Sequence, residues 1–395
     1  MRFLQADWIF PLNGPARNDA VLAVKDDGTI VAILHEDEVD PLNVERYEGV
    51  LCPGFINAHC HLELSHLWGC IERGTGLVSF LLAIAHRRQT HAGVELDDDL
   101  LQEYISAADH QMQQAGIVGV GDVSNTDLSF RVKAKSHLRY HTFVECFALN
   151  AHQAELRFHK AKQVQQKAAQ HGLTATLTPH APYSVSALLL ERIVNDGGTK
   201  IFSIHYLESD AERELLQAGT GPLRKLLPYL NVGENYFESQ PIQWPDVVLQ
   251  RLRAGATVLL VHNTVASETD LLRWLSHSSQ VFLCTCPNAN LYIENQLPNY
   301  RLWKKVTDRI CVGTDSLASN DQLSVLEELK TIQAHEPELE LGELLLWACR
   351  NGAQCLGWSD LGTLEEGKRP GVNVIYPIDV QPFRLKTSST VKRLI

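Results

Sequence analysis

The chain lacks the features that mark several classes of protein. None of its 395 residues belongs to an apolar run approaching about 18 residues, and no charged segment leads into an apolar run near its start, so neither a membrane helix nor a secretory leader is predicted. It has no long basic run, and 35 Lys and Arg against 47 Asp and Glu give a net charge of −12, which disfavours nucleic acid as a partner. Internal repeats and low-complexity segments are also missing. We therefore expect a soluble, cytoplasmic protein that binds neither a membrane nor nucleic acid.

The cysteines do not indicate a disulfide framework. They number nine, which is odd, and most lie in apolar, strand-like surroundings such as Leu51-Cys52 and Cys146-Phe147. That setting is typical of reduced thiols in a protein core. Cys284 and Cys286 have no second pair nearby, so we do not expect them to hold zinc.

What the chain does have is a succession of short apolar runs. With 45% hydrophobic residues it can bury a sizeable core. Eight runs, separated mainly by helical patterns, occur at residues 50–56, 116–123, 141–148, 173–178, 201–206, 257–262, 280–284 and 309–314. Eight is the number of strands in a closed (β/α)8 barrel of the TIM type. The sequence therefore predicts an α/β fold with a barrel over residues 53–358.

Both ends of the chain have β character. Residues 20–25 and 29–34 flank Asp26-Asp27-Gly28, which is a hairpin signal, and residues 371–376 and 390–395 also have the pattern of strands. We expect residues 1–52 and 359–395 to form the two parts of one small β-sandwich domain.

Two helices of the barrel can be predicted from their caps and apolar faces. The first begins at an acidic triplet, which we interpret as a cap and not as a metal site, and ends at Gly116. Its predicted apolar stripe consists of Leu100, Tyr104, Ala108 and Met112. In the second helix, Asn320 is the predicted cap, and Leu323, Leu326 and Leu329 share a face.

A histidine or a carboxylate follows several of the apolar runs, where a barrel places its active-site residues. His59-Cys60-His61 alone carries little information, because 17 histidines in 395 residues give a His-x-His about 0.7 times by chance. Residues i and i+2 of a strand point to the same side, however, so both imidazoles can bind one ion. With His205 and Asp315 at the same mouth, three imidazoles and a carboxylate suit one divalent ion, zinc or iron, with a position left for water. Alternatively, His205 is a hydrogen-bonded core histidine and Asp315 a turn residue.

Other residues near the strand ends are candidates for chemistry and substrate binding. Glu208 could carry a proton, His262 could hydrogen-bond the attacked group and His180 could contact substrate, although a solvated loop carboxylate and two structural histidines remain the alternatives. Residues 74–82 form a hydrophobic segment that is either a lid over the substrate or an ordinary packed helix. If it is a lid, Glu63 or Glu72 could meet sugar hydroxyls.

Together these motifs resemble the amidohydrolase superfamily over nearly the whole chain. The motifs are Pro53-Gly54-Phe55-Ile56-Asn57-Ala58-His59-Cys60-His61, His180-Ala181-Pro182-Tyr183-Ser184, His205-Tyr206-Leu207-Glu208, Cys286-Pro287-Asn288 with Asn290, and residues 313–320. They are most similar to the branch that holds guanine, cytosine and adenosine-type deaminases and chlorotriazine hydrolases. The resemblance implies one metal at His59, His61, His205 and Asp315, with Glu208 as the acid that protonates a ring nitrogen and His262 as a partner of the attacking hydroxide. It also implies a homodimer. Residues 173–186 lack the lysine that bridges two ions in binuclear members.

Within that branch, residues 55–65, 180–185 and 205–209 are similar to aminofutalosine deaminases. Two stretches depart from the family pattern, residues 290–295 at the barrel mouth and residues 367–371 in the predicted satellite domain. We expect a deaminase that releases ammonia by attack of metal-bound hydroxide on a purine-like heterocycle, with 6-aminodeoxyfutalosine, in menaquinone biosynthesis, as the first candidate substrate. The alternatives are a guanine, adenosine, S-adenosylhomocysteine or pterin deaminase, a hydrolase that releases chloride or cleaves an amide, and a non-catalytic metal- or ligand-binding protein.

Overall fold

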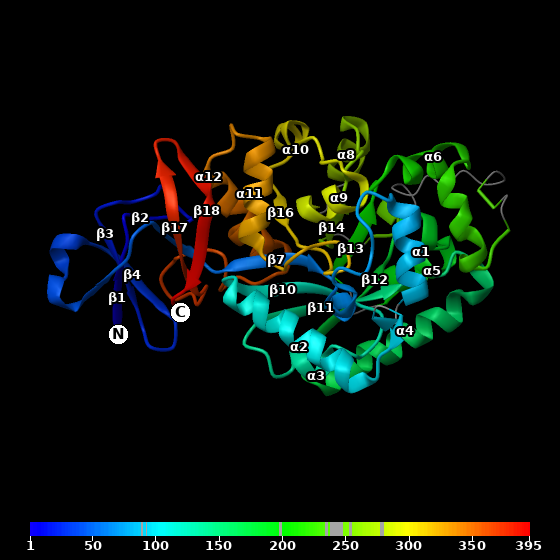
Figure 1. The fold of residues 1–395 in the computed structure, drawn as a ribbon, viewed down its shortest axis with the longest axis horizontal. Coiled ribbons are helices and arrows are strands. Elements are labelled where there is room, and N and C mark those ends of the chain that lie inside the picture. The colour runs from blue at the N-terminus through cyan, green and yellow to red at the C-terminus, as the bar shows by residue number, and fades with distance from the viewer. Residues whose placement is uncertain are drawn as a thin grey trace.

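The computed structural model describes residues 1–87, 90–91, 93–196, 200–233, 236–237, 248–252, 255–276 and 280–395. A helix-covered barrel makes up most of the molecule, and a smaller β-rich lobe lies at one end of it (Figure 1). Both chain termini lie in this lobe, where the guanidinium Nη1 of Arg2 donates to the carbonyl oxygen of Leu394 at 2.8 Å. Among the described residues, no helix combines the length and the apolar character needed to cross a membrane.

The lobe contains two four-stranded sheets built from both ends of the chain. One has the order β4-β3-β1-β5 and the other the order β18-β17-β6-β2. The strands are β1 (Arg2–Gln5), β2 (Trp8–Ile9), β3 (Ala20–Val24), β4 (Ile30–His35), β5 (Val44–Arg46), β6 (Val50–Pro53), β17 (Val372–Val380) and β18 (Phe383–Arg393). Buried side chains of both sheets, among them Leu22 and Val374, belong to one hydrophobic cluster. The predicted hairpin is confirmed, since β3 and β4 pair antiparallel, and so are the two C-terminal strands.

The described residues of the barrel include eight parallel strands, in two sheets of four. The first sheet has the order β12-β11-β10-β7 and the second the order β13-β14-β15-β16. The strands are β7 (Phe55–Cys60), β10 (Ile117–Ser124), β11 (Arg139–Cys146), β12 (Thr174–Pro179), β13 (Ile201–Tyr206), β14 (Thr257–His262), β15 (Gln280–Thr285) and β16 (Ile310–Val312). The barrel prediction is confirmed at the level of a TIM-type fold.

Two seams join the half-sheets into a barrel. At one seam the backbone N–H of Thr314 donates to the carbonyl of His59 at 3.0 Å, and Gly313 allows this approach because a Cβ there would lie 2.8 Å from that same carbonyl oxygen. At the other seam the N–H of His205 donates to the carbonyl of His180 at 3.0 Å. The carboxyl ends of β7, β12, β13 and β16 are thereby held at one mouth.

One predicted strand is wrong in its bounds. Residues 50–56 do not form a single barrel strand, because Val50–Pro53 pairs with β17 in the lobe and the barrel strand begins at Phe55. Gly54 lies between the two, and a Cβ there would come within 2.3 Å of the Val118 side chain. The chain therefore passes from lobe to barrel at a residue that must lack a side chain, and the apolar pattern continues across it.

Helices cover the outside of the barrel and connect its strands. The α-helices are α1 (Leu77–Arg87), α2 (Asp98–Gln114), α3 (Phe130–Lys133), α4 (Ala154–Gln170), α5 (Ala187–Asn195), α6 (Asp210–Ala218), α8 (Glu268–Leu275), α9 (Pro287–Glu294), α10 (Tyr300–Val306), α11 (Val325–His335), α12 (Leu341–Leu345) and α13 (Gly352–Cys355). A π-helical turn, η7 (Leu346–Asn351), joins the last two. Shorter 3-10 turns are η1 (Glu36–Glu38), η2 (Pro41–Asn43), η3 (Leu62–Leu67), η4 (Ala151–Gln153), η5 (Pro182–Ser184) and η6 (Pro222–Leu230), and a small hairpin consists of β8 (Thr90–His91) and β9 (Val94–Glu95).

The two predicted helices are present, with corrections. Asp97 caps α2 by accepting from the N–H of Leu100, as the acidic triplet indicated. The buried face of α2 begins with Leu101 and Ile105, and Leu100 is 42% exposed, so the first half of the predicted stripe was wrong by one residue. The cap of α11 is Ser324 and not Asn320. Asn320 instead donates its side-chain amide to the carbonyl of Thr314 at 2.9 Å, which fixes the loop after β16. All nine cysteines are free thiols.

Candidate active site

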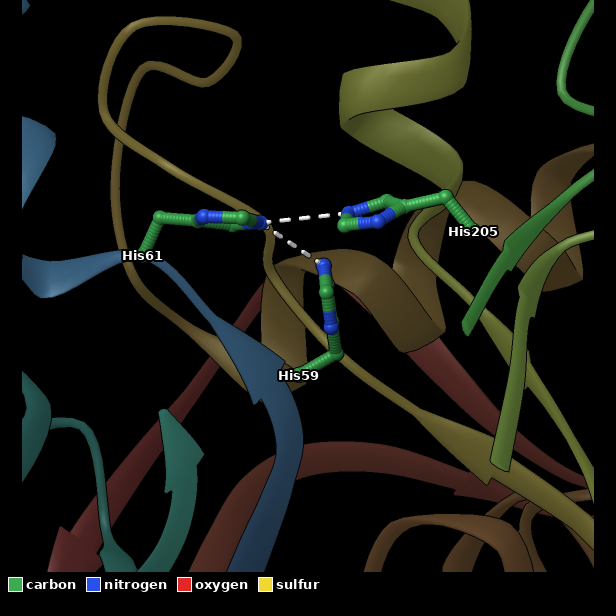
Figure 2. A group of neighbouring side chains, drawn as sticks. All are labelled: His59, His61 and His205. Carbon is green, nitrogen blue, oxygen red and sulfur yellow. Dashed lines mark hydrogen bonds between the residues drawn. The ribbon is translucent and has the colours of Figure 1, made fainter. Parts of the chain in front are cut away.

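Three imidazoles meet at the mouth of the barrel. His59 ends β7 together with Cys60, His61 follows it directly and His205 lies near the end of β13. The Nε2 atom of His61 lies 3.1 Å from Nε2 of His59 and 3.3 Å from Nε2 of His205. Figure 2 shows the three rings pointing toward one another from different sides. The structure thus brings together side chains separated by 144 positions in the sequence.

The spacing of these nitrogens fits a single metal ion. Two nitrogens bound tetrahedrally at about 2.0–2.1 Å from an ion lie roughly 3.3–3.4 Å apart, close to the distances found here. Asp315 supplies a fourth donor, since its Oδ1 atom lies 3.4 Å from Nε2 of His61 and 3.8 Å from Nε2 of His59. Its Oδ2 atom accepts a hydrogen bond of 2.6 Å from the hydroxyl of Ser319, which holds the carboxylate in place. The donor set therefore suits one divalent ion.

Burial favours the neutral form of these imidazoles, which is the form that binds a metal. His59 and His205 are buried, and burial, reinforced by the neighbouring imidazoles, lowers the pKa of both rings well below its usual range. The neutral ring is the form that binds a metal. The Nδ1 atom of His205 lies 3.1 Å from the carbonyl oxygen of His180, so we assign the ring proton to Nδ1 and leave Nε2 for the ion.

Several strand ends at the mouth have unusual backbone conformations. Leu207, His262, Asn263 and Asp315 have positive φ angles of 46°, 70°, 49° and 56°. Such conformations are unfavourable for side chains other than glycine, and they concentrate at functional sites where the surrounding structure enforces them. Glu208 follows Leu207 directly, and the side chains of Glu208 and His262 line the cavity at the barrel mouth, so these backbone conformations position both groups.

Glu208 and His262 lie together beside the imidazoles, and the ring centroids of His262 and His205 are 5.5 Å apart. Oε1 of Glu208 is 3.7 Å from Nε2 of His262, and both side chains are buried. Burial, helped by the nearby carboxylate of Asp315, raises the pKa of Glu208 well above its usual range. Burial lowers the pKa of His262, and its Nδ1 atom lies 3.5 Å from the amide oxygen of Asn290. Burial therefore favours the uncharged form of both groups, the carboxylic acid of Glu208 and the neutral imidazole of His262.

A cavity of about 350 Å³ opens beside this centre. The metal-type donors His61, His205 and Asp315 line it, and so do Glu208, His262 and His180. Nδ1 of His180 donates to the hydroxyl of Ser184 at 2.7 Å, because that hydroxyl itself donates to the carbonyl of Ala181. His180 is thus fixed at the wall, in a position to contact a ligand.

The two carboxylates suggested for sugar binding lie elsewhere. Neither Glu63 nor Glu72 is among the residues that line the cavity. Glu63 is buried and accepts from the backbone N–H groups of Asn125 and Thr126, each at 3.1 Å, which fixes the loop after β10. Glu72 is exposed. Their contact with a substrate stays a prediction.

The hydrophobic segment at residues 74–82 forms part of the cavity wall. It contains the first half of α1, of which Leu77, Phe80 and Leu81 line the cavity. The start of this helix is anchored on α9, because the N–H of Leu77 donates to Glu294 Oε1 at 2.6 Å and that of Gly76 to the carbonyl of Ile293 at 3.0 Å. Residues 290–295, which depart from the family pattern, thus support a wall of the site. Whether the segment closes as a lid stays a prediction.

Sequence reasoning missed Glu145, which also lines the cavity. It lies near the end of β11, its Oε2 accepts from the amide of Asn125 at 2.9 Å and its Oε1 lies 3.7 Å from Nδ1 of His205. A carboxylate after the apolar residues Phe143-Val144 follows the rule that singled out Asp315, so the signal was present. Glu145, His180 and His205 also lie close enough together to hold an ion.

The fold and this donor set define a class, a parallel barrel with a histidine-rich metal-type centre at the carboxyl ends of its strands. Residues 50–395 match the model of the family described as "Amidohydrolase family", and the chain belongs to this family. The resemblance inferred from the motifs is thereby confirmed. Members are metal-dependent hydrolases, and this chain is a hydrolase that acts on carbon–nitrogen bonds.

Two curated relatives agree with this placement, and a solved structure shares the fold. The chain is 30% identical over 338 residues to an adenosine deaminase of Helicobacter pylori, covering 82% of this chain and 78% of that one. It is 26% identical over 340 residues to an aminodeoxyfutalosine deaminase of Nitratiruptor sp., with the same two coverages. The crystal structure of Helicobacter pylori aminofutalosine deaminase in complex with methylthio-coformycin covers 100% of both chains with a TM-score of 0.81 at 24% identity. That similarity shows the fold.

Proposed function

We propose that the protein is a metal-dependent hydrolytic deaminase of an amino-substituted, purine-like heterocycle. The observation that carries the proposal is the buried acid Glu208, 3.7 Å from Nε2 of His262, at a cavity that is also lined by His61, His205 and Asp315. A ring nitrogen needs a proton before the neighbouring carbon can lose its amino group, and a buried carboxylic acid with a raised pKa is suited to supply one. An amino group also needs a proton in order to leave as ammonia, whereas chloride leaves without one, so proton-transfer groups at the site favour deamination.

A divalent ion held by His59, His61, His205 and Asp315 would supply a water activated for attack at neutral pH. Asp315 accepts a proton from the attacking water on Oδ1, while Ser319 holds its other oxygen. Glu208 donates its proton to the ring nitrogen beside the amino-bearing carbon. His262 orients the incoming oxygen. The water oxygen and the amidine carbon form a new C–O bond. Asp315 then passes its proton to the amino group, the C–N bond breaks and ammonia leaves. The proton of the new hydroxyl group replaces the one that Glu208 gave up, so a carbonyl product forms and both carboxyl groups return to their starting states.

For the substrate we propose 6-aminodeoxyfutalosine first, and with it a role in menaquinone biosynthesis. A relative 26% identical over 82% of this chain is named for that substrate, which supports this choice. Adenosine is the second candidate, because the relative at 30% identity is named an adenosine deaminase. Zinc is the proposed ion, since three imidazoles and one carboxylate suit it, and iron is the alternative.

We further propose that the two sheets of the lobe form a β-sandwich domain from residues 1–52 and 359–395, with the barrel over residues 53–358. Their shared hydrophobic cluster supports this division. A homodimer in the cytoplasm also remains a proposal, which light scattering and cell fractionation would test.

The test of function is release of ammonia, with chloride measured in parallel, by the metal-loaded protein from a panel of heterocycles. The panel contains aminodeoxyfutalosine, adenosine, S-adenosylhomocysteine, guanine, cytosine, a pterin and a chlorotriazine. Fastest turnover of aminodeoxyfutalosine would support the full proposal. Preference for another amine would keep the deaminase and discard the pathway, and release of chloride alone would overturn both.

A further inference from the structure

A fully buried carboxyl group that takes no part in the proposed chemistry lies behind the barrel mouth. Glu328 is on α11, its exposed fraction is 0%, and it does not line the cavity. Oε1 of Glu328 accepts from the side-chain amides of Asn320 at 2.7 Å and Asn288 at 3.0 Å, and Oε2 accepts from the backbone N–H of Asn288 at 2.9 Å. We call these three residues the Asn–Glu–Asn brace. Burying such a group is costly unless its partners satisfy it, as they do here.

One side of the brace fixes the peptide unit that precedes Asp315. The amide nitrogen of Asn320 has two hydrogens, and besides Glu328 it donates to the carbonyl oxygen of Thr314 at 2.9 Å. The N–H of Asp315 donates to the carbonyl of His59 at 3.1 Å, so this planar unit is held at both ends. Asp315 has a φ of 56°, which a residue with a side chain keeps only where its surroundings enforce it. The direction of the Asp315 carboxylate therefore depends on the hydrogen bond from Asn320.

The other side of the brace reaches the helix that supports His262. Asn288 lies in the first turn of α9, and its side-chain oxygen accepts from the hydroxyl of Thr331 at 2.6 Å, so both ends of its amide are bound to α11. Asn290 follows on the same helix, and its amide oxygen lies 3.5 Å from Nδ1 of His262. Glu328 thus joins the loop after β16 to the helix that carries the partner of His262.

We propose that Glu328 is a positioning residue, which acts through Asn320 to direct the carboxylate of Asp315 toward the metal-type imidazoles. The inference rests on the proposed function and adds to it a residue that touches neither ion nor substrate. Burial raises the pKa of Glu328 to about 8, but each oxygen keeps a lone pair in either protonation state. Glutamine has almost the same size, but its amide nitrogen cannot accept, so in Glu328→Gln at least one asparagine N–H would face another N–H donor.

The test follows the metal site of Glu328→Gln with Co²⁺ as the bound ion, because the visible absorption of Co²⁺ reports the geometry of its ligands without turnover. We expect the dissociation constant for Co²⁺ to rise by about tenfold or more and the visible spectrum to change, since losing a group that orients a metal ligand typically costs about 10–100-fold. With the best substrate of the panel, kcat should fall by at least about tenfold while KM changes by less than about threefold, because Glu328 does not line the cavity.

Glu327→Gln is the matched control. Glu327 precedes Glu328 on the same helix, its side chain is 32% exposed, and its partner is Lys330 at 2.7 Å. This variant should keep the wild-type Co²⁺ affinity, spectrum and kcat. Equal changes in the two variants would mean that α11 acts only through folding, and would overturn the proposal. So would a wild-type Co²⁺ affinity and spectrum in Glu328→Gln.

Asn320→Ala tests the same connection if Glu328→Gln does not fold. It removes the donor to the carbonyl of Thr314 and leaves the carboxyl group of Glu328 in place. The Co²⁺ affinity should fall and the spectrum should change in this variant too. A wild-type spectrum and affinity in Asn320→Ala would overturn the proposal.

The Co²⁺ measurements also separate this proposal from the proposed function. A changed spectrum in Glu328→Gln, with no ammonia released from any compound by the wild type, would support the brace and overturn the deaminase. Ammonia release by the wild type, with an unchanged spectrum in Glu328→Gln, would do the reverse. Failure of the wild type to bind Co²⁺ would overturn the brace as a support for a metal ligand.

Discussion

The change Glu208→Gln tests the proposed acid directly. Glutamine has nearly the shape of a protonated glutamic acid and can still hydrogen-bond a ring nitrogen, but it has no proton to transfer. The wild-type carboxyl is buried and burial raises its pKa, which favours its uncharged form, so replacement by a neutral amide of the same shape should leave folding intact. A positioned general acid contributes about 10²–10⁴-fold to the rate, and we therefore expect kcat to fall by at least about a hundredfold.

The assay is steady-state ammonia release with the best substrate of the panel, with metal content measured in the same preparations. Glu212→Gln is the matched control, because Glu212 is also fully buried, accepts the backbone N–H of Glu208 at 2.9 Å and does not line the cavity. The kcat of Glu212→Gln should fall by less than about tenfold, since glutamine still offers an acceptor to the N–H of Glu208. A near wild-type kcat in Glu208→Gln, with metal retained, would refute the assignment of the acid.

Three further predictions concern metal, pH and folding. Asp315→Asn should lower kcat by at least about a hundredfold and weaken metal retention, because it removes both a proton acceptor and a charged donor; an unchanged rate and metal content after dialysis would contradict this. Burial raises the pKa of Glu212 to about 8. The contribution of this group to folding stability is therefore fully present below the pKa that it has in the unfolded chain, and it is lost progressively as the pH rises toward 8. Between about pH 5 and pH 8 the melting temperature of Glu212→Gln should accordingly fall less than that of the wild type. Parallel curves of melting temperature against pH for the two proteins would count against the raised pKa of Glu212. Lys133→Met would leave Asp122, its fully buried ion-pair partner, without a cation. It should lower the free energy of unfolding by about 3–5 kcal/mol in denaturant titrations, and a loss below about 1 kcal/mol would show that the pair matters little.

The sequence allowed the barrel and its metal-type donors to be predicted because both depend on local patterns. A strand buried on both faces is a short apolar run, and the polar residue that follows it lies at the mouth whatever the length of the connecting helix. The predicted strands at residues 201–206 and 257–262 agree with β13 and β14 in both bounds. His59, His61, His205 and Asp315 meet for the same reason.

Features that depend on tertiary contacts could not be predicted in this way. The division of residues 50–56 between two sheets is decided by the pairing of β6 with β17, more than 300 residues away in the sequence. Asn320 is of a residue type that often caps helices, but its side-chain amide donates to the carbonyl of Thr314. That η6 lines the same cavity as α1 could not be predicted either, because an amphipathic segment does not reveal which cavity its apolar side will face.

The positions of the four donors have a mechanical consequence. His59 and His61 lie at the end of β7, His205 near the end of β13, and Asp315 just beyond β16, and these are edge strands of the two half-sheets. An ion held by all four would connect the two half-sheets of the barrel, in addition to any part in chemistry. Removing it with a chelator should therefore loosen the closure itself, and the strand ends at the mouth should become the first backbone amides to exchange with solvent.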